Sequence, residues 1–494
     1  MLTRLFSSHF AINTRLLMLA GLLSLTGCAI NPVTGDSDFV LMSEDDEIAI
    51  GRKNHPKIIE QYGLYEDPAL QRYVQRIGDK LAAKSHRSNL LYRFTVLDSA
   101  QINAFALPGG YIYITRGLLA YLNNEAQLAA VLGHEIGHVT ARHGVRQQSA
   151  SAATGLLAAI LASQAGFAGA DNISNALGAA LVSGYGRDHE LESDGLGAEY
   201  LARTGYDPNA MLEVIKVLKD QEVYDRAQAK KEGREPQTYH GLFASHPDND
   251  TRLQSVVGKA NKLKVNDNGE KVKLVTFLQN MEGLVYGDSE AQGIQRGRNF
   301  YHKDLGITIA MPEGWRTENQ PSRLIAIAPN NAAVLQIQSL DRNKRLSPEN
   351  FLRQRLKLKR LRSGEAFNHN GFQGYTAVAT ADTPYGLRFT RYIVLYKGDK
   401  AWVFLGAAKD SNKPYQYDKA ILDTARSFRP LRKHEIKLAK AMKLHIVVAK
   451  KDRSFDTLAK SSRISNDAEG RLRLLNHYYP KGEPPLGTPL KIVK

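Results

Sequence analysis

The segment Val131-Leu132-Gly133-His134-Glu135-Ile136-Gly137-His138 decides the fold of the first half of this chain. Residues four apart on a helix lie about 40° apart around its axis, so His134 and His138 can direct both imidazoles at one metal ion. Glu135 is rotated by about 100° from His134, where its carboxylate can serve as a general base beside the metal. The segment therefore predicts a helix that carries a zinc site. Two core histidines on a buried helix are the alternative interpretation.

A catalytic zinc ion needs a third protein ligand and one open position. His143 is one candidate. It lies about 140° around the helix from His138, and we therefore expect it to face away from the metal.

The segment Arg187-Asp188-His189-Glu190-Leu191-Glu192-Ser193-Asp194 is the better source of the third ligand. Glu190 and Asp194 are four apart on a predicted helix, so one carboxylate can bind the metal while the other supports a ligand histidine from behind. His189 and Glu192 point elsewhere on that helix, and we expect them to be surface or packing residues.

The elements around this motif are predicted from hydrophobic periodicity. Two helices with apolar residues at helical spacing precede it, and a short strand and a hairpin or edge strand with a Pro-Gly-Gly turn lie between them and the motif. In chain order these are Glu47–Gln61, Pro68–Lys84, Phe94–Leu97 and Asn103–Ile114.

Beyond Glu125 the pattern stays helical for more than a hundred residues. The small, apolar stretches Gly155–Phe167 and Ile173–Val182 are each too short to span a bilayer and predict a buried helical hairpin. A flap that touches a membrane or covers substrate is the alternative. Further helices are expected at Leu212–Leu218 and Arg252–Leu263, and the charged stretch Gln228–Gln237 is expected to be a mobile loop.

The second half of the chain has the pattern of a separate α+β domain. From Phe300 to Phe428, short alternating runs separated by glycine and proline turns predict strands, interrupted by one basic helix at Pro348–Leu361. The expected strands are Ile307–Ala310, Leu324–Ile327, Val334–Ile337, Arg391–Tyr396 and Ala401–Leu405. A last unit from about His445 to Lys494 is predicted to contain a strand, two short helices and a strand.

Cys28 is the single cysteine, so no intramolecular disulfide can form. It follows an apolar run, Leu16–Leu25, that is too short to span a membrane stably. The sequence Leu25-Thr26-Gly27-Cys28 resembles a bacterial lipobox, in which the cysteine is lipidated and becomes the mature N-terminus. We therefore expect residues 1–27 to be a signal peptide. An ordinary signal peptide that happens to contain a cysteine is the alternative.

The residue after the cysteine, Ala29, is not an aspartate. By the sorting rule of Gram-negative lipoproteins, this indicates the periplasmic face of the outer membrane if the host is Gram-negative. Several acyl chains on one residue exceed what stable anchoring requires.

The formal net charge is +16, which favours acidic partners such as anionic lipid or nucleic acid. Nine of the basic residues lie between Arg342 and Arg362, and no nucleic-acid-binding motif accompanies them. A solvated helix face is the simpler interpretation, and we expect no nucleic-acid partner.

The combined motifs resemble the gluzincin peptidases of the HtpX and CAAX prenyl protease family, in particular the periplasmic lipoprotein branch of the beta-barrel assembly-enhancing protease type. The resemblance covers roughly Ser43 to Leu263. Besides the two segments quoted above, it rests on Asn103-Ala104-Phe105-Ala106-Leu107-Pro108-Gly109-Gly110 and on His246-Pro247 with Arg252. The family often has Ser and Ala where this chain has Gly186 and Ser193, and neither position is a ligand.

The resemblance implies one Zn²⁺ ion per chain, bound by His134, His138 and Glu190. It also implies a proton-transfer role for Glu135 and a supporting role for Asp194 behind a ligand histidine, expected to be His134. The strand with Phe105, Ala106, Leu107, Gly109 and Gly110 would pair with an extended substrate backbone.

His246 has two possible roles in this family resemblance. As a neutral fourth ligand it would cap the zinc and keep the enzyme idle, and as a hydrogen-bond donor it would stabilise the oxyanion. A structural histidine on a loop is the third possibility. We favour the cap.

The resulting prediction is an α+β chain. It comprises a tether at 28–46, a mainly helical gluzincin protease domain with a small edge-strand sheet at 47–287, a β-rich α+β domain at 297–432 and a LysM-like module at 433–494. The predicted function is a zinc endopeptidase that cleaves unfolded or misassembled cell-envelope proteins, with peptidoglycan as a possible partner of the C-terminal module. A periplasmic chaperone or a cell-wall-binding lipoprotein with a mostly closed zinc site is the alternative.

Overall fold

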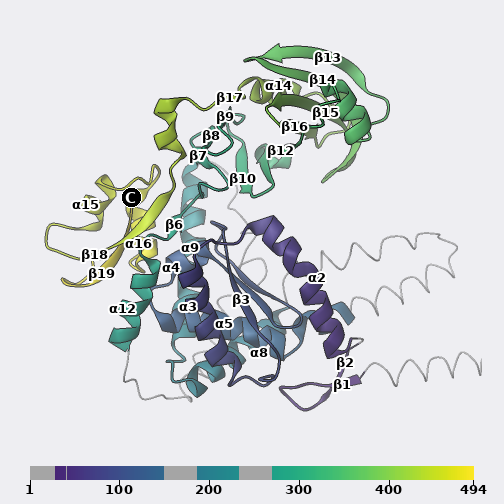
Figure 1. The fold of residues 1–494 in the computed structure, drawn as a ribbon. Helices are drawn as coiled ribbons and strands as arrows, with labels where there is room; N and C mark the ends of the chain where they lie inside the picture. Colours follow the sequence, from purple (N-terminus) through teal and green to yellow (C-terminus); the bar gives the residue numbers. More distant parts are fainter. Residues whose placement is uncertain (1–27, 41, 150–185, 233–269) are drawn as a thin grey trace, which may run out of the picture. The chain divides into compact units, whose positions relative to one another are not determined.

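Two compact units make up the described part of the chain in this computed structural model (Figure 1). The structure describes residues 28–40, 42–149, 186–232 and 270–494. Within them, the first unit contains the residues up to Lys57, then Leu64–Leu284 and Lys443–Lys494, and the second contains Ile58–Gly63 and Val285–Met442. Both units mix helices with sheets, which confirms the α+β class predicted from the sequence.

The sheet of the first unit has the strand order β3-β5-β4, with β3 at Arg93–Leu97, β4 at Ala104–Leu107 and β5 at Tyr111–Thr115. Strands β3 and β5 are parallel, and β4 and β5 form the antiparallel hairpin expected from the sequence. Gly109 and Gly110 have φ values of 79° and 83°, a backbone conformation that strongly favours glycine, so these residues permit the turn. Strand β4 is thereby placed at an edge of the three-stranded sheet.

Helices α3 (Pro68–Ala82), α4 (Arg116–Tyr121) and α5 (Glu125–Thr140) pack against this sheet. Helix α3 begins at a clear capping signal, because its N-cap Asp67 accepts two backbone N–H groups and Pro68 opens the first turn, and one face places Leu70, Val74 and Ile77 in the core. The helices of this part are α2 Glu44–Tyr62, α3 Pro68–Ala82, α4 Arg116–Tyr121, α5 Glu125–Thr140, α8 Arg187–Arg203, α9 Ala210–Glu232 and α12 Glu270–Met281. None of the helices in the described ranges combines the length and apolar character that crossing a membrane requires.

Helices α5 and α8 cross at their glycines. A Cβ atom on Gly137 would lie 3.0 Å from Cα and O of Ser193, and one on Gly197 would lie 3.1 Å from the backbone nitrogen of His134. Glycine at these positions allows the two backbones to approach closely. The close approach is what brings the polar residues of α8 within reach of the histidines of α5.

The N-terminal stretch is more structured than the expected tether. Strands β1 Cys28–Ile30 and β2 Ser37–Phe39 pair as an antiparallel hairpin, and α2 begins at Glu44. Asn31 stabilises the turn because its Oδ1 accepts the backbone N–H of Val33 and Thr34, while its Nδ2 donates to Asp38 at 2.8 Å. The sequence expectation missed the hairpin because its two strands are only three residues long.

The last fifty residues have the predicted order of strand, helix, helix and strand, with β18 Met442–Val448, α15 Phe455–Lys460, α16 Ala468–Leu475 and β19 Pro489–Val493. Strands β18 and β19 pair antiparallel. Residues Lys443–Lys494 belong to the same compact unit as helix α5, although the sequence suggests a separate module.

The second unit is dominated by antiparallel sheets. A seven-stranded sheet has the order β10-β11-β12-β16-β15-β14-β13, and a four-stranded sheet has the order β17-β9-β8-β7. Their shared core includes Phe404, Phe428 and Ile421, the last from helix α14 Asp418–Arg426. The strands are β6 Val285–Tyr286, β7 Ile294–Arg296, β8 Asn299–His302, β9 Ile307–Ala310, β10 Arg316–Gln320, β11 Arg323–Ile327, β12 Ala333–Asp341, β13 Arg362–His369, β14 Phe372–Thr383, β15 Gly386–Lys397, β16 Lys400–Ala408 and β17 Arg429–Pro430.

The predicted basic helix at Pro348–Leu361 is wrong in its length. Only Pro348–Asn350 (α13) and Phe351–Arg355 (η2) are helical, and Lys357 and Arg360 have φ values of 56°. Beyond the helical turns, Leu356, Leu358 and Leu361 pack as partly buried residues against the cluster that contains Phe351. Packing of these leucines therefore overrides a continuous helix, and the basic side chains between them are exposed.

Several expectations lie outside the described residues. These are the signal peptide at residues 1–27, the apolar stretches Gly155–Phe167 and Ile173–Val182, the helix Arg252–Leu263 and the loop histidine His246. Of the stretch Gln228–Gln237, residues 228–232 are described, and they form the end of helix α9 instead of a loop.

Candidate active site

Three buried side chains from two helices converge in the first unit. His134 and His138 come from α5 and Glu190 from the first turn of α8, and one potential ligand atom from each lies within 4.8 Å of the other two. The Nε2 atoms of the two histidines are 3.0 Å apart. Oε2 of Glu190 lies 3.4 Å from Nε2 of His134, and Oε1 of Glu190 lies 3.4 Å from Nε2 of His138. The helical spacing of four residues and the glycine contact between α5 and α8 account for this convergence.

His134 is oriented by Asp194, which lies one helical turn after Glu190 on α8. Nδ1 of His134 lies 2.8 Å from Oδ1 of Asp194, and both residues are buried. Because an ionised carboxylate can only accept, Nδ1 of His134 carries the hydrogen and Nε2 directs a lone pair towards Glu190 and His138.

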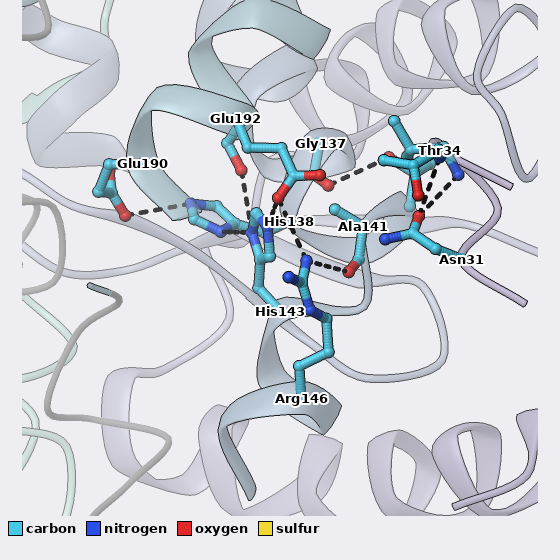
Figure 2. Close-up of polar contacts among 12 residues, drawn as sticks. Asn31, Thr34, Gly137, His138, Ala141, His143, Arg146, Glu190 and Glu192 are labelled. Atoms are coloured by element: carbon cyan, nitrogen blue, oxygen red, sulfur yellow. Dashed lines mark hydrogen bonds and ion pairs between the residues drawn. The ribbon is translucent and has the colours of Figure 1, made fainter. Parts of the chain in front are cut away.

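The second histidine is oriented by another histidine (Figure 2). Nδ1 of His138 lies 2.8 Å from Nδ1 of His143, whose Nε2 lies 2.9 Å from Oε2 of Glu192. The expectation that His143 faces away from the site is therefore wrong, since the chain leaves the helix at Ala141 and Arg142 adopts a φ of 55°. That bend turns His143 back towards His138 and buries it completely.

The hydrogen-bond partners assign the tautomer of His138 as well. Glu192 accepts from Nε2 of His143, so the other nitrogen of a neutral His143 accepts a hydrogen from Nδ1 of His138. Nε2 of His138 then also carries a lone pair. With both imidazoles neutral in these tautomers, their Nε2 atoms and the Glu190 carboxylate face one point.

Such a donor set fits a zinc ion. Neutral imidazole Nε2 atoms and a carboxylate are ordinary zinc ligands, and three protein ligands leave a fourth position open, as in catalytic zinc sites. Ligand histidines that donate their other N–H to a protein acceptor are also typical of such sites. A cation bound at this point would relieve the repulsion between the facing lone pairs.

The electrostatics show that the site favours a positive charge. Burial lowers the pKa of His134, but hydrogen bonds to Asp194 and Glu190 outweigh it and raise the pKa to about 9. Burial holds the pKa of His138 well below its usual value. The site therefore attracts one positive charge, and it keeps the second imidazole neutral.

Glu192 and His189 belong to the group behind His138 and are not independent surface residues. Glu192 also accepts from Nη1 of Arg146 at 3.2 Å, and its hydrogen bond with His143 lowers its pKa. The His189 ring stacks on His143 with centroids 4.2 Å apart. Arg146 in turn lies 3.5 Å from Asp38 of the N-terminal hairpin. The contacts among His143, Glu192 and His189 could not be predicted from helical spacing, because His143 lies beyond the end of α5.

Glu135 is fully buried between the two ligand histidines in the sequence of α5. Strand β4, which packs near α5, carries Phe105, Ala106 and Leu107. The ring of Phe105 stacks on Tyr113 of the neighbouring strand, with centroids 4.9 Å apart. The candidate base and the candidate substrate strand are thus carried by two elements that contact each other.

A cavity of about 360 Å³ lies at the opposite, N-terminal end of α5. It is lined by α5, α9, α12 and the C-terminal residues, among them Gln127, Glu213, Lys216 and Tyr478. His134, His138 and Glu190 do not line it, so we do not assign this cavity to the catalytic site.

Comparison with known proteins gives three results. Residues 68–260 match the model of Peptidase family M48. Similar curated proteins include the Beta-barrel assembly-enhancing protease of Yersinia pestis, 32% identical over 243 residues that cover 47% of this chain and 48% of that protein. They also include the Mitochondrial metalloendopeptidase OMA1 of Schizosaccharomyces pombe, 29% identical over 185 residues that cover 36% of this chain and 54% of that protein.

The chain thus spans about half the length of the curated relatives it matches. Among solved structures, cyanobacterial PsbP from Synechocystis sp. PCC 6803 matches with 11% identity and a TM-score of 0.21, covering 28% of this chain and 93% of that one. That score does not establish a shared fold.

Proposed function

The chain carries a zinc metallopeptidase domain of family M48 over residues 68–260, and we propose that the protein is an endopeptidase for unfolded or misassembled proteins of the cell envelope. One observation supports the catalytic part most strongly. His134, His138 and Glu190 converge with both histidine tautomers set for metal binding, and Glu135 lies between the two histidines on the same helix.

Each residue of the site then has a distinct role. His134, His138 and Glu190 would hold a zinc ion, which would supply Lewis-acid polarisation of the scissile carbonyl. Glu135 takes a proton from the attacking water as the new C–O bond forms at the carbonyl carbon, and it passes this proton to the amine nitrogen when the C–N bond breaks in the following step. Asp194 and the His143–Glu192 pair hold the two imidazoles in the orientation that the reaction needs.

The preference for unfolded substrates follows from the edge strand. Strand β4 pairs with β5 on one side, and within the described residues no strand pairs with its other side. An extended peptide can add to such an edge through main-chain hydrogen bonds, which favours unfolded segments over folded ones with little regard to sequence. We assign Phe105, Ala106 and Leu107, with Gly109 and Gly110 at the turn, to substrate binding.

The envelope location rests on the lipobox-like sequence that ends at Cys28. We propose that lipidated Cys28 anchors the protein at the periplasmic face of the outer membrane. One of the similar proteins is named for its effect on β-barrel assembly, which is consistent with misassembled outer-membrane proteins as substrates.

His246 completes the proposed site. We keep the proposal that its imidazole caps the zinc in the resting enzyme, with oxyanion stabilisation as the alternative. The two roles are distinguished by His246→Ala acting on an unfolded substrate, because loss of a cap accelerates cleavage and loss of an oxyanion donor slows it by roughly 10²–10³-fold.

The proposed function is tested with the full-length protein in detergent. We expect that removal of the metal by a chelator abolishes cleavage of reduced, unfolded casein and that one zinc equivalent per chain restores it. The same enzyme should cleave a stably folded protein much more slowly. Cleavage that persists in metal-free protein, or equal rates on folded and unfolded substrates, would contradict the proposal.

A further inference from the structure

A lysine near the C-terminus is buried in the first unit, against the helix that precedes the metal-site helix. The side chain of Lys491, on β19, has no solvent exposure, and its Nζ donates to the carbonyl oxygens of Ala120 at 2.6 Å and Leu122 at 2.7 Å. Nε2 of His477 donates to the carbonyl of Tyr121, which lies between them, at 2.9 Å. Three consecutive carbonyl groups are therefore bound by two side chains from the C-terminal residues.

These carbonyls stand at the end of helix α4, where backbone acceptors have no partner within the helix. A cationic or hydrogen-bond-donating side chain there supplies the missing partner and interacts favourably with the helix dipole. Without Lys491 and His477, the carbonyls would be buried and unsatisfied, which is costly.

The bound segment leads directly into the active-site helix. Asn124 is the N-cap of α5, where its Oδ1 accepts the backbone N–H of Gln127 at 2.8 Å. The Gln127 side chain in turn accepts the N–H of Asn123 at 2.7 Å. Only one residue, Asn123, separates the carbonyl held by Lys491 from this N-cap. The position of the first turn of α5 thus depends on where the C-terminal residues hold the end of α4.

The lysine is itself held firmly. Asn476, which follows α16, accepts the backbone N–H of Lys491 at 2.8 Å and donates to its carbonyl oxygen at 2.9 Å. A second contact joins residues 443–494 to helix α9: the ring of Tyr224 on α9 packs edge-on against that of Tyr479, with centroids 5.5 Å apart. Burial also lowers the pKa of Lys491 well below its usual value. A lysine on the free surface of a separate glycan-binding module would have no reason to be placed in this way.

We propose that residues 443–494 are a positioning part of the peptidase, in which Lys491 and His477 bind the carbonyls of residues 120–122 and fix the start of helix α5. These residues act on the reaction through the helix that carries His134 and Glu135, so they are positioning residues and not catalytic ones. The kinetic part of this inference rests on the proposed peptidase function, whereas the docking itself does not.

The test uses the full-length protein and combines hydrogen–deuterium exchange with steady-state kinetics on unfolded casein. Lys491→Met removes the donor while keeping the length of the side chain, and Lys451→Met, at an exposed position of the same C-terminal residues, is the matched control. We expect Lys491→Met to raise amide exchange across residues 120–128 by roughly tenfold or more and to lower kcat with little change in KM. We expect the control to match the wild type.

A pair of variants at His477 keeps the proposal testable if Lys491→Met does not fold. His477→Gln retains an N–H donor and should restore protection of residues 120–128 relative to His477→Leu. Exchange at residues 120–128 that stays at the wild-type level in Lys491→Met, or in both His477 variants, would overturn the proposal. If the wild type proves inactive on every peptide substrate, the exchange result still decides the docking, so the two failures are distinguishable.

Discussion

Nδ1 of His138 lies 2.8 Å from Nδ1 of His143, and this contact orients the second proposed metal ligand through a histidine–glutamate pair. The first ligand, His134, is held directly by the carboxylate of Asp194 at the same distance. The two imidazoles thus have different supports, although they occupy equivalent places in the motif. Because of this difference, substitutions can distinguish the residues that bind the metal from the residues that orient them.

His143→Ala should lower zinc affinity by roughly 10–100-fold, because His138 loses the acceptor that fixes its tautomer and ring orientation. Glu192→Gln should have a smaller effect in the same direction, since an amide still accepts from His143. Competition with a chromogenic zinc chelator measures both. Glu199→Gln, further along the same helix and paired with Arg203 near the surface, is the control. Affinities of both variants within twofold of the wild type would rule out the supporting role.

Glu190→Gln should lower the zinc affinity more than His143→Ala does. The first substitution removes the charge of a proposed ligand, whereas the second removes only a side chain that orients a ligand. The same competition assay ranks the two variants. The assignment of Glu190 as third ligand fails if the His143 variant loses zinc while the Glu190 variant retains it.

Gly137→Ala should destabilise the first unit and weaken zinc binding together. The added methyl would lie 3.0 Å from the backbone of Ser193, so α8 must move away from α5 and carry Glu190 with it. Overpacking of this kind costs about 1–3 kcal/mol. Urea unfolding and zinc titration report the two effects. Gly186→Ala, where a Cβ would meet no atom of the described residues within 4 Å, is the matched control, and equal behaviour of the two variants would contradict the close-contact account.

Cys28→Ala should move the protein from the membrane fraction to the soluble fraction, because the proposed acyl chains are lost. Fractionation followed by a high-salt wash measures this, with Ser37→Ala in the same hairpin as the control. Membrane association that survives both the substitution and the wash would point to another attachment.

The sequence was sufficient for the parts of the site that obey helical geometry. His134 and His138 are four residues apart on one helix, as are Glu190 and Asp194 on another, and the structure places each pair as that spacing requires. His143 could not be placed in this way because the chain leaves the helix before reaching it, and the left-handed φ of Arg142 is set by the surrounding fold. Arg142 and Arg87 both bind buried Glu47, a long-range contact that no local pattern reveals.

The same limit applies to the rest of the fold. Leu356, Leu358 and Leu361 are placed by packing against a sheet that is distant in the sequence, and the prediction of a continuous helix was wrong for this reason. The order of elements in residues 443–494 was predicted from their pattern, but their docking through Lys491 was not. A lysine in a strand normally indicates a position that is exposed to solvent. Only the three-dimensional structure places the amino group of Lys491 against the end of α4.

Glu135→Gln tests the central claim most directly. The full-length variant and wild type are compared for bound zinc, for folding and for the appearance of new N-termini in reduced casein, measured by mass spectrometry. Loss of a general base typically lowers the rate by roughly 10²–10⁴-fold, and Glu135 is not one of the three residues that could hold the metal. The account predicts one zinc per chain, an unchanged fold and cleavage reduced by that factor. Wild-type cleavage by the zinc-loaded variant would contradict it.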